Sequence, residues 1–219
     1  MREARLAVRN RIIADTRIAT VGAGSSTTVV QVGVGEAASW AKGDIASFTG
    51  TGATLANDKL IRTITGVDTS LHRLTLESAL PVAPASGNQV RGGCREWLID
   101  SLAGGDGVFE WGHDPHPLQA LIALETEKRC ICMMNGFAAT PGPLGRIEPA
   151  GQLDLYGLDG LWLEGLETRI RQILHDRQSA LTASGHKVWS VKVASLPEVF
   201  RGDVRQRTAF VDLSLTRAA

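Results

Sequence analysis

The chain has no excess of charge of either sign, few aromatic residues and few cysteines. Over its 219 residues, 23 Lys and Arg balance 23 Asp and Glu, and aromatic residues make up 5%. A protein that binds a phosphate backbone through bulk charge carries a basic excess, so this balance argues against that class. With 43% hydrophobic and 21% charged residues, the composition is that of a folded globular chain.

Long hydrophobic runs are also missing. No stretch approaches the roughly 20 apolar residues that a membrane-spanning helix needs. Residues 1–18 are charged and lack the apolar centre of a signal peptide, so we expect a protein made in the cytoplasm. A net charge of zero reduces the solubility of a free monomer, which favours a subunit of an assembly.

Three cysteines cannot form a closed disulfide framework. Cys130 and Cys132 are one residue apart and would share one face of a strand, whereas Cys94 is distant in sequence. The nearest histidines, His113 and His116, enclose an Asp-Pro turn, so they do not complete a metal-ligand set on a helix face. We expect buried reduced thiols; the alternative is interchain disulfides in an extracellular particle.

The motifs of common catalytic and cofactor sites are absent from the sequence. It contains no GxSxG elbow, HExxH helix or CxxC pair. Residues 22–26 (Gly-Ala-Gly-Ser-Ser) resemble a phosphate loop but lack its lysine and precede a predicted strand, not a helix. The carboxylates fall in different predicted elements. We therefore name no catalytic, cofactor-binding or metal-ligating residue, and expect a non-enzymatic protein without a cofactor.

Hydrophobic periodicity divides the chain into two kinds of segment. Residues 1–18 have the 3–4 spacing of an amphipathic helix. Residues 19–92 are rich in Thr, Ser, Gly and Val and contain five alternating runs separated by turn signals: 28–32, 44–48, 60–65, 73–77 and 88–91. This pattern predicts a small all-β barrel or sandwich (19–92) inserted into a scaffold made of residues 1–18 and 93–219.

The scaffold is predicted to be α+β, with a small, mostly antiparallel sheet packed by two helices. A short helix is expected at 95–102, a loop at 140–145, and strands at 118–125, 129–134, 152–156, 187–193 and 208–215. Alternation places Trp189, Val191 and Val193 on one face of their strand, and Ala209, Val211, Leu213 and Leu215 on one face of the last strand.

The strongest helix signal runs from Leu161 to about Ser179. Its predicted apolar stripe is Leu163, Leu166, Ile170, Ile173 and Leu174, and the residues predicted to face away are Glu164, Glu167, Arg171, Gln172 and Asp176. Glu167 and Arg171 are spaced to form an i,i+4 ion pair.

The order of these elements resembles the tail terminator proteins of long-tailed bacteriophages. The resemblance is carried by residues 5–13 as a first helix, by 153–160 leading into the long helix, by the strand around Trp189, and by the closing strand 205–215. Residues 63–76 and the turn at 42–44 resemble accessory β domains of phage virion proteins, although typical terminators lack such an insert.

The resemblance implies a structural virion protein of the phage tail or neck. Members of this family form a ring, usually a homohexamer, on the last ring of the tail tube. The ring stops tube growth and presents a surface to neck or connector proteins, with or without a sheath, while DNA passes through the lumen unbound. The strand 207–215 and the region 132–134 are candidate contact surfaces, and plain core is the alternative for both.

Other readings of the sequence remain open. The chain could be another neck or head–tail connector, a tail tube subunit or a baseplate component. A carbohydrate-binding β module is a further alternative, with Trp40 and Phe48 as its aromatic platform. Most of the five tryptophans (40, 97, 111, 162 and 189) are expected to be core or interface anchors. Basic residues are not interleaved with them, so no base-stacking platform is predicted.

Overall fold

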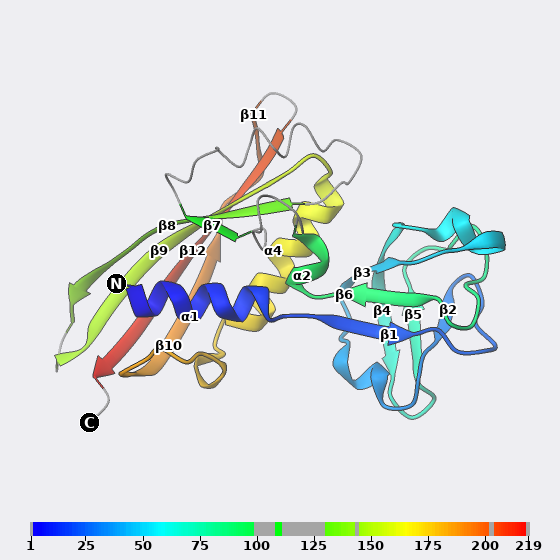
Figure 1. Ribbon diagram of the computed structural model, residues 1–219, viewed down its shortest axis with the longest axis horizontal. Helices are drawn as coiled ribbons and strands as arrows, with labels where there is room; N and C mark the ends of the chain where they lie inside the picture. Colours follow the sequence, from blue (N-terminus) through cyan, green and yellow to red (C-terminus); the bar gives the residue numbers. More distant parts are fainter. Residues whose placement is uncertain (1, 99–107, 111–129, 143–144, 202–203, 218–219) are drawn as a thin grey trace. The chain divides into compact units, whose positions relative to one another are not determined.

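The protein is an α+β structure with mostly β content, as the sequence predicts, and it divides into two compact units (Figure 1). The computed structural model describes residues 2–98, 108–110, 130–142, 145–201 and 204–217. Unit 1 contains residues 1–15 and 97–219, and unit 2 contains residues 16–96.

Unit 1 is a sheet with helices on one face. Its strands are β7 (Val108–Glu110), β8 (Cys130–Pro141), β9 (Ile147–Gly157), β10 (His186–Ser195) and β12 (Val204–Arg217), in the order β10-β12-β9-β8-β7. The short strand β11 (Val199–Arg201) pairs with β12. All pairings are antiparallel except β7 with β8. Helix α4 (Gly160–Leu174) packs on β8, β9, β10 and β12, and α1 (Arg2–Ile13) contacts α4 and β8.

Local sequence explains where α4 begins and which face it buries. Asp159 is its N-cap, and its carboxylate accepts hydrogen bonds from the backbone N–H groups of Leu161 (2.9 Å) and Trp162 (3.3 Å). The predicted apolar stripe is confirmed, because all five of its residues are buried. The opposing odd-numbered residues of β12, from Ala209 to Leu215, are buried as well.

Unit 2 is a six-stranded antiparallel sheet that closes on itself. Its strands are β1 (Arg17–Thr20), β2 (Val29–Gln31), β3 (Ile45–Phe48), β4 (Ile61–Asp68), β5 (Arg73–Leu76) and β6 (Gln89–Gly92), in the order β1-β6-β3-β4-β5-β2. A bridge between Val21 and Val32 joins the two ends of this order. The N–H of Gly22 also donates to the Gln31 carbonyl at 2.8 Å, so the sheet forms a barrel without long free edges.

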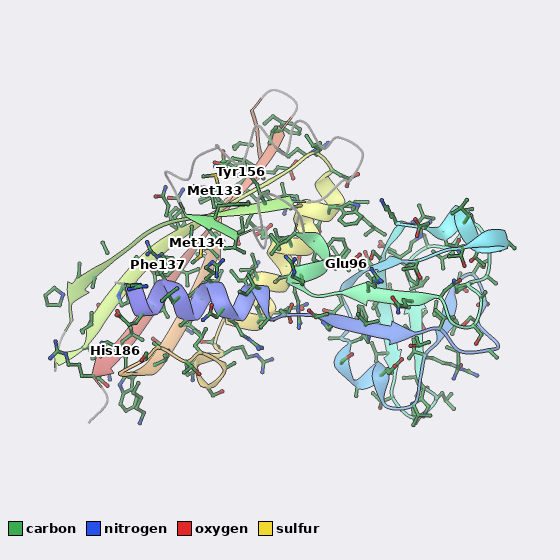
Figure 2. All side chains as sticks on the ribbon, viewed as in Figure 1. Glu96, Met133, Met134, Phe137, Tyr156 and His186 are labelled. Carbon is green, nitrogen blue, oxygen red and sulfur yellow. The ribbon has the colours of Figure 1, made fainter. Side chains whose placement is uncertain are left out.

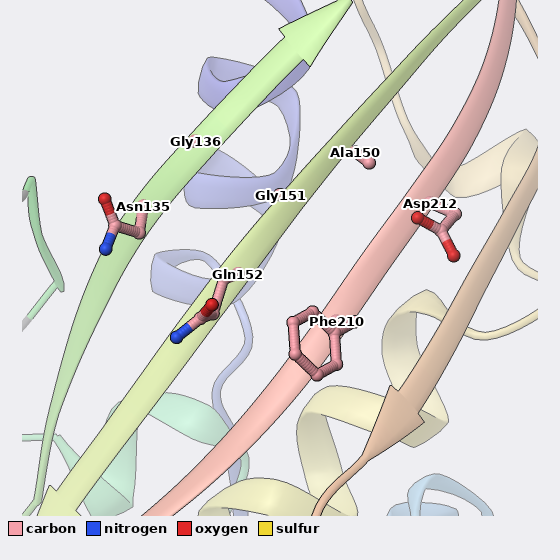
Figure 3. Close-up of a pocket in the computed structure, with 7 residues that line it drawn as sticks. All are labelled: Asn135, Gly136, Ala150, Gly151, Gln152, Phe210 and Asp212. Atoms are coloured by element: carbon pink, nitrogen blue, oxygen red, sulfur yellow. The ribbon is translucent and has the colours of Figure 1, made fainter.

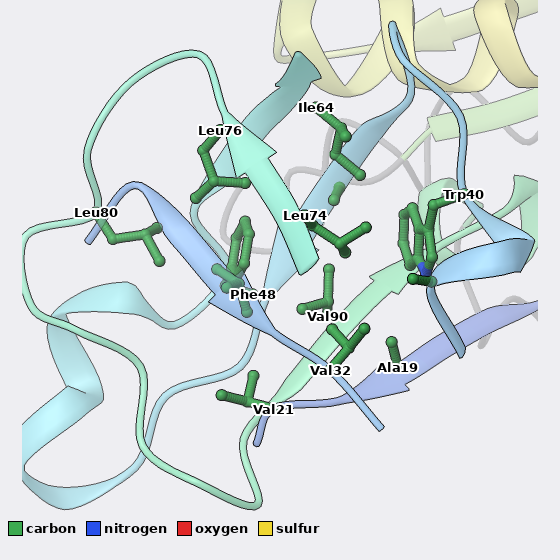
Figure 4. Close-up of a cluster of buried hydrophobic side chains, with 13 residues drawn as sticks. Ala19, Val21, Val32, Trp40, Phe48, Ile64, Leu74, Leu76, Leu80 and Val90 are labelled. Carbon is green, nitrogen blue, oxygen red and sulfur yellow. The ribbon is translucent and has the colours of Figure 1, made fainter. Parts of the chain in front are cut away.

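The barrel encloses an apolar core and one buried ion pair. Trp40, Phe48, Ile64 and Leu74 are among the core side chains (Figure 4). The Arg17 guanidinium forms a salt bridge with the Asp44 carboxylate and also donates to the Ser39 carbonyl at 2.8 Å. Asp44 is 2% exposed and also accepts the N–H of Ala41 at 2.6 Å.

Two sequence predictions are wrong at the junction of the units. The first helix ends at Ile13 instead of continuing to residue 18, and an unpredicted strand, β1, begins at Arg17. Asp15 lies beyond the helix and binds the Arg169 guanidinium of α4 through both carboxylate oxygens, at 2.6 and 2.8 Å. This tertiary contact holds the end of α1 against α4, which local periodicity could not reveal.

Other element boundaries also differ from the prediction. Residues 140–145 were expected to form only a loop, but the ladder continues through Thr140 and Pro141, which pair with Glu148 and Ile147. Proline is tolerated at the end of a strand because no ladder hydrogen bond need be donated there. Helix α4 ends at Leu174 instead of near Ser179. The helix predicted at 95–102 is represented by α2 (Cys94–Trp97).

Several predicted features lie outside the described residues: residues 99–102 of the short helix, the strand 118–125, Trp111, His113 and His116. Within the described part of the chain, no helix is long and apolar enough to cross a bilayer.

Replacing Asp44 by alanine is expected to destabilise the barrel by about 3–5 kcal/mol, because Arg17 would keep a buried charge without its carboxylate. Urea unfolding of the full chain measures this change. The matched control is Glu77→Ala, which removes an exposed carboxylate of the same unit and should change stability by less than about 0.5 kcal/mol. Equal effects of the two substitutions would contradict a structural role for the ion pair.

Candidate functional site

The sheet of unit 1 has two unlike faces. Odd-numbered residues of β12 face the helices, as the hydrogen bond from Arg207 to Glu167 of α4 shows. Even-numbered residues of β12 and their partners on neighbouring strands face the other way. We call the exposed part of this second side the open face; it comprises Asn135, Ala138, Thr140, Glu148, Ala150, Gln152, Lys187, Ser190, Lys192, Ala194, Phe210 and Asp212.

A hollow of about 310 Å³ lies in the open face. Gly136, Ala150 and Gly151 form its floor, and the side chains of Asn135, Gln152, Phe210 and Asp212 stand around them (Figure 3). Phe210 is 37% exposed, although it lies in the middle of a long strand. The hollow therefore combines small residues with an accessible aromatic ring.

A β-bulge in β8 produces the floor of this hollow. Pairing with β9 shifts between Gly136 and Ala138, and both Gly136 and Phe137 have positive φ. The bulge turns Phe137, which is labelled in Figure 2, to the helix side, where it is fully buried. A Cβ on Gly151 would lie 2.3 Å from the Phe137 ring, so glycine is required there to make room for that ring on the helix side.

The buried carboxylate of Asp154 holds one side chain of the hollow, that of Gln152, in place. Asp154 is 4% exposed and accepts hydrogen bonds from Gln152 Nε2 (2.8 and 2.9 Å), Gln206 Nε2 (3.1 Å) and Thr208 Oγ1 (2.7 Å). A buried charge is stable only when hydrogen bonds replace its hydration. This network holds the Gln152 side chain at the rim of the hollow.

Next to this network, apolar side chains continue the same side of the sheet. Met133 and Tyr156, labelled in Figure 2, pack with Phe109, Ile131 and Val204. The side opposite α4 is therefore apolar and buried at one end and polar and open at the other.

A second hollow, of about 480 Å³, lies on the helix side at the start of α4. Glu198 accepts hydrogen bonds from Arg205 Nη1 (2.8 Å) and Arg207 Nε (3.0 Å). Burial alone raises the pKa of Glu198, but the hydrogen bonds and charges of Arg207 and Arg205 outweigh it and hold that pKa below its usual value. Burial likewise lowers the pKa of Arg207, but its bonds to Glu167 and Glu198 raise the pKa above its usual value.

Exposed apolar side chains border this second hollow. Leu161, in the first turn of α4, is 55% exposed and lines it. Phe200 of β11 is 66% exposed, and the Arg205 guanidinium lies over its ring at 4.9 Å from the ring centroid. An exposed aromatic ring stacked on an arginine is a common anchor of protein interfaces.

Known proteins provide no further assignment. No family model and no curated protein matches the chain.

The predicted ion pair between Glu167 and Arg171 is wrong. Glu167, expected to face solvent, is 7% exposed, and its Oε2 accepts a hydrogen bond from Arg207 Nη1 at 2.5 Å. Glu167 can be buried between α4 and the sheet because Arg207 of β12 lies opposite it and binds its carboxylate. A helical periodicity cannot show which charged residue the neighbouring strand will neutralise.

The four tryptophans among the described residues are three core residues and one exposed residue. Trp40, Trp97 and Trp162 are buried, and the rings of Trp97 and Trp162 meet edge to face with centroids 5.1 Å apart. Because Trp40 and Phe48 both lie in the barrel core, the aromatic platform expected for a carbohydrate-binding module is not exposed there.

Trp189 does not share a face with Val191 and Val193, contrary to the prediction. A bulge between Val188 and Ser190 displaces it, and Trp189 is 44% exposed. Lys187 Nζ lies 4.1 Å and Arg146 Cζ lies 5.8 Å from its ring centroid. Lys187 is two residues away in sequence, whereas Arg146 is brought to this ring by the fold.

The predicted buried thiols are confirmed. Cys94, Cys130 and Cys132 are buried and are not joined in a disulfide. Burial, and secondarily the negative charge of Asp159, raises the pKa of Cys130 far above its usual value, so this thiol stays protonated. Met133 and Met134, the other residues of that region, are buried too, which supports the core interpretation of 132–134.

Among the described residues, no group of three or more His, Cys, Asp or Glu side chains is arranged to hold a metal ion. The candidate sites are therefore two surfaces. One is the open face, with a hollow whose floor is made of small residues; the other is the charged hollow on the helix side, bordered by Leu161 and Phe200. Such an arrangement is suited to contacts with other proteins.

The Glu198 network predicts a specific pH dependence of stability. Because the folded-state pKa of Glu198 is lowered, its contribution is complete above the ordinary value of 4.5 and is lost as the pH falls below it. Glu198→Gln should therefore destabilise the protein by on the order of 1–2 kcal/mol at pH 7, and by progressively less towards pH 3. Urea unfolding at a series of pH values measures the difference.

The control is Glu164→Gln, which replaces an exposed carboxylate that forms no ion pair within the described residues. Its stability should follow the wild type at every pH. A Glu198→Gln variant whose deficit stays constant from pH 7 to pH 3 would contradict the proposed ionic contribution.

Proposed function

We propose that this chain is a structural virion protein of the phage tail terminator class. In this function, copies form a ring, of six subunits, at the head-proximal end of the tail tube. The ring ends tube polymerisation and joins the tail to neck or connector proteins, while DNA passes through the lumen without specific binding.

The observation that carries this proposal is the two-sided sheet of unit 1. A terminator must bind the tube end on one surface and refuse another tube subunit on the opposite one, so it needs two chemically different surfaces. One side of the sheet is covered by α4 and α1, and the other presents the open face with its hollow. The exposed aromatic residues Phe200 and Phe210 provide interface anchors on the two sides.

We further propose that the barrel, residues 16–96, is an accessory domain inserted into the terminator scaffold. The chain leaves unit 1 after residue 15 and returns at residue 97, and the barrel has its own closed sheet and core. Other neck, tube or baseplate roles would use the same kind of assembly and are distinguished by what the purified protein caps or joins.

The ring is tested by light scattering followed by negative-stain imaging of the purified full chain. We expect a single species of about six subunit masses, seen as a ring, that binds the end of preformed tail tubes and stops their growth. A monomer over the concentration range of the experiment that leaves tube growth unchanged would contradict the proposal.

The insertion is tested by replacing residues 16–96 with a short Gly-Ser linker. We expect the remaining scaffold to unfold cooperatively and to keep its oligomeric state, since unit 1 has its own sheet and helices. Loss of cooperative unfolding in this variant, seen by circular dichroism during urea titration, would show that the two units form one folding domain.

A further inference from the structure

Phe200 forms a protruding knob on the helix side of the sheet. It lies on β11 opposite Arg205 of β12, and paired residues of neighbouring strands point to the same side. Arg205 is an odd-numbered residue of β12 and lines the hollow at the start of α4, so Phe200 projects on the α4 side. With 66% of its surface exposed, Phe200 is more exposed than Trp189 (44%) or Phe210 (37%).

The hollow in the open face has the properties of a matching hole. Its volume of about 310 Å³ is sufficient for an aromatic side chain, and its floor of Gly136, Ala150 and Gly151 lets a ring approach the backbone. Phe210 provides a ring for edge-to-face or offset stacking. Asp212 stands at the same hollow and has no ion pair within the described part of the chain.

The knob of one copy cannot fill the hole of the same copy. Phe200 is level with Arg205, and Ala150 is level with Asp212; seven residues of β12, about 23 Å of strand, separate these two levels. The knob and the hole also lie on opposite sides of the sheet. A two-fold contact of one face with itself therefore cannot use both.

We propose that unit 1 associates head to tail, with Phe200 of one copy inserted into the Gly136–Ala150–Gly151 hollow of the next, against Phe210. In this contact Arg205, which is 37% exposed and accompanies Phe200, lies near Asp212 of the neighbouring copy. The complementarity thus combines an aromatic pair with opposite charges.

A head-to-tail contact leaves one knob and one hole unused on every open chain of copies. Such a chain either closes into a ring or continues as a filament. The inference deepens the proposed ring function and rests on it only for closure. The partner of the open face is then a second copy of the chain, and Phe200 is the side chain that enters the hollow.

Photocrosslinking tests the contact directly. Phe200 is replaced in the full chain by p-benzoylphenylalanine, which keeps the aromatic knob, and the irradiated protein is digested and analysed by mass spectrometry. We expect intermolecular adducts on residues 135–152 or 210–212. The same photocrosslinker at Leu55, an exposed apolar position of the barrel (64% exposed), should give no adducts there. Adducts of the Phe200 variant confined to other regions, or none at all, would overturn the inference.

A complementation experiment tests the direction of the contact. Phe200→Asp removes the knob, and Ala150→Trp fills the hole; each should lower self-association at least tenfold by light scattering. Mixed in equal amounts, the two variants retain one intact knob and one intact hole, so we expect heterodimers that do not grow further. Val34→Asp, at an 87% exposed position of the barrel, is the matched control for an added surface charge.

Circular dichroism and urea unfolding establish that both variants are folded, and Asp212→Arg is a second hole variant that does not fill the floor. Failure of folded variants to form heterodimers would overturn the head-to-tail arrangement. Rings that persist in both single variants would refute this contact and leave the ring proposal intact. Hollow-directed adducts from the Phe200 photocrosslinker variant, together with a wild type that forms only filaments, would support the contact and refute the terminator function.

Discussion

The packing of α4 against one side of a long antiparallel sheet is the interaction on which the rest of unit 1 depends. Burial of each large apolar side chain of the stripe stabilises the folded state by about 1.5–3 kcal/mol. Leu163, Leu166 and Ile170 therefore hold α4 against this side of the sheet, which becomes part of the core. Arg207 reinforces the contact by binding Glu167 beneath the helix. Because successive side chains of a strand point to opposite sides of the sheet, the alternate residues of each strand must face away from α4, and these residues make up the open face.

The periodic parts of this fold could be predicted because they depend on spacing alone. The stripe of α4 and the alternation of Ala209 to Leu215 both follow from the positions of apolar residues, and the structure confirms them. The prediction failed where a single residue changes the register. The bulges at Phe137 and Trp189 each displace one side chain, and no apolar pattern marks an extra residue in a strand. The position of Glu167 depended on a partner 40 residues away in sequence.

The candidate contact residues could not be predicted for a related reason. Catalytic motifs are recognisable because chemistry fixes residue types at fixed spacings, whereas a protein contact requires only shape and exposure. Phe200 and Phe210 are ordinary aromatic residues in the sequence. They become notable only because β11 leaves Phe200 66% exposed and because Phe210 is exposed on the side of the sheet opposite to α4. The expected contact strand 207–215 does include Phe210 and Asp212, but its odd-numbered apolar residues are core.

Hydroxyl-radical footprinting of the wild-type protein, in its assembled form and after dilution, tests most directly whether the two sides of the sheet meet in the assembly. The account predicts that Phe200 and Phe210 are both reactive after dilution and both protected on assembly, while buried Phe48 stays unreactive throughout. Assembly that leaves either exposed ring as reactive as in the dilute protein would contradict the account.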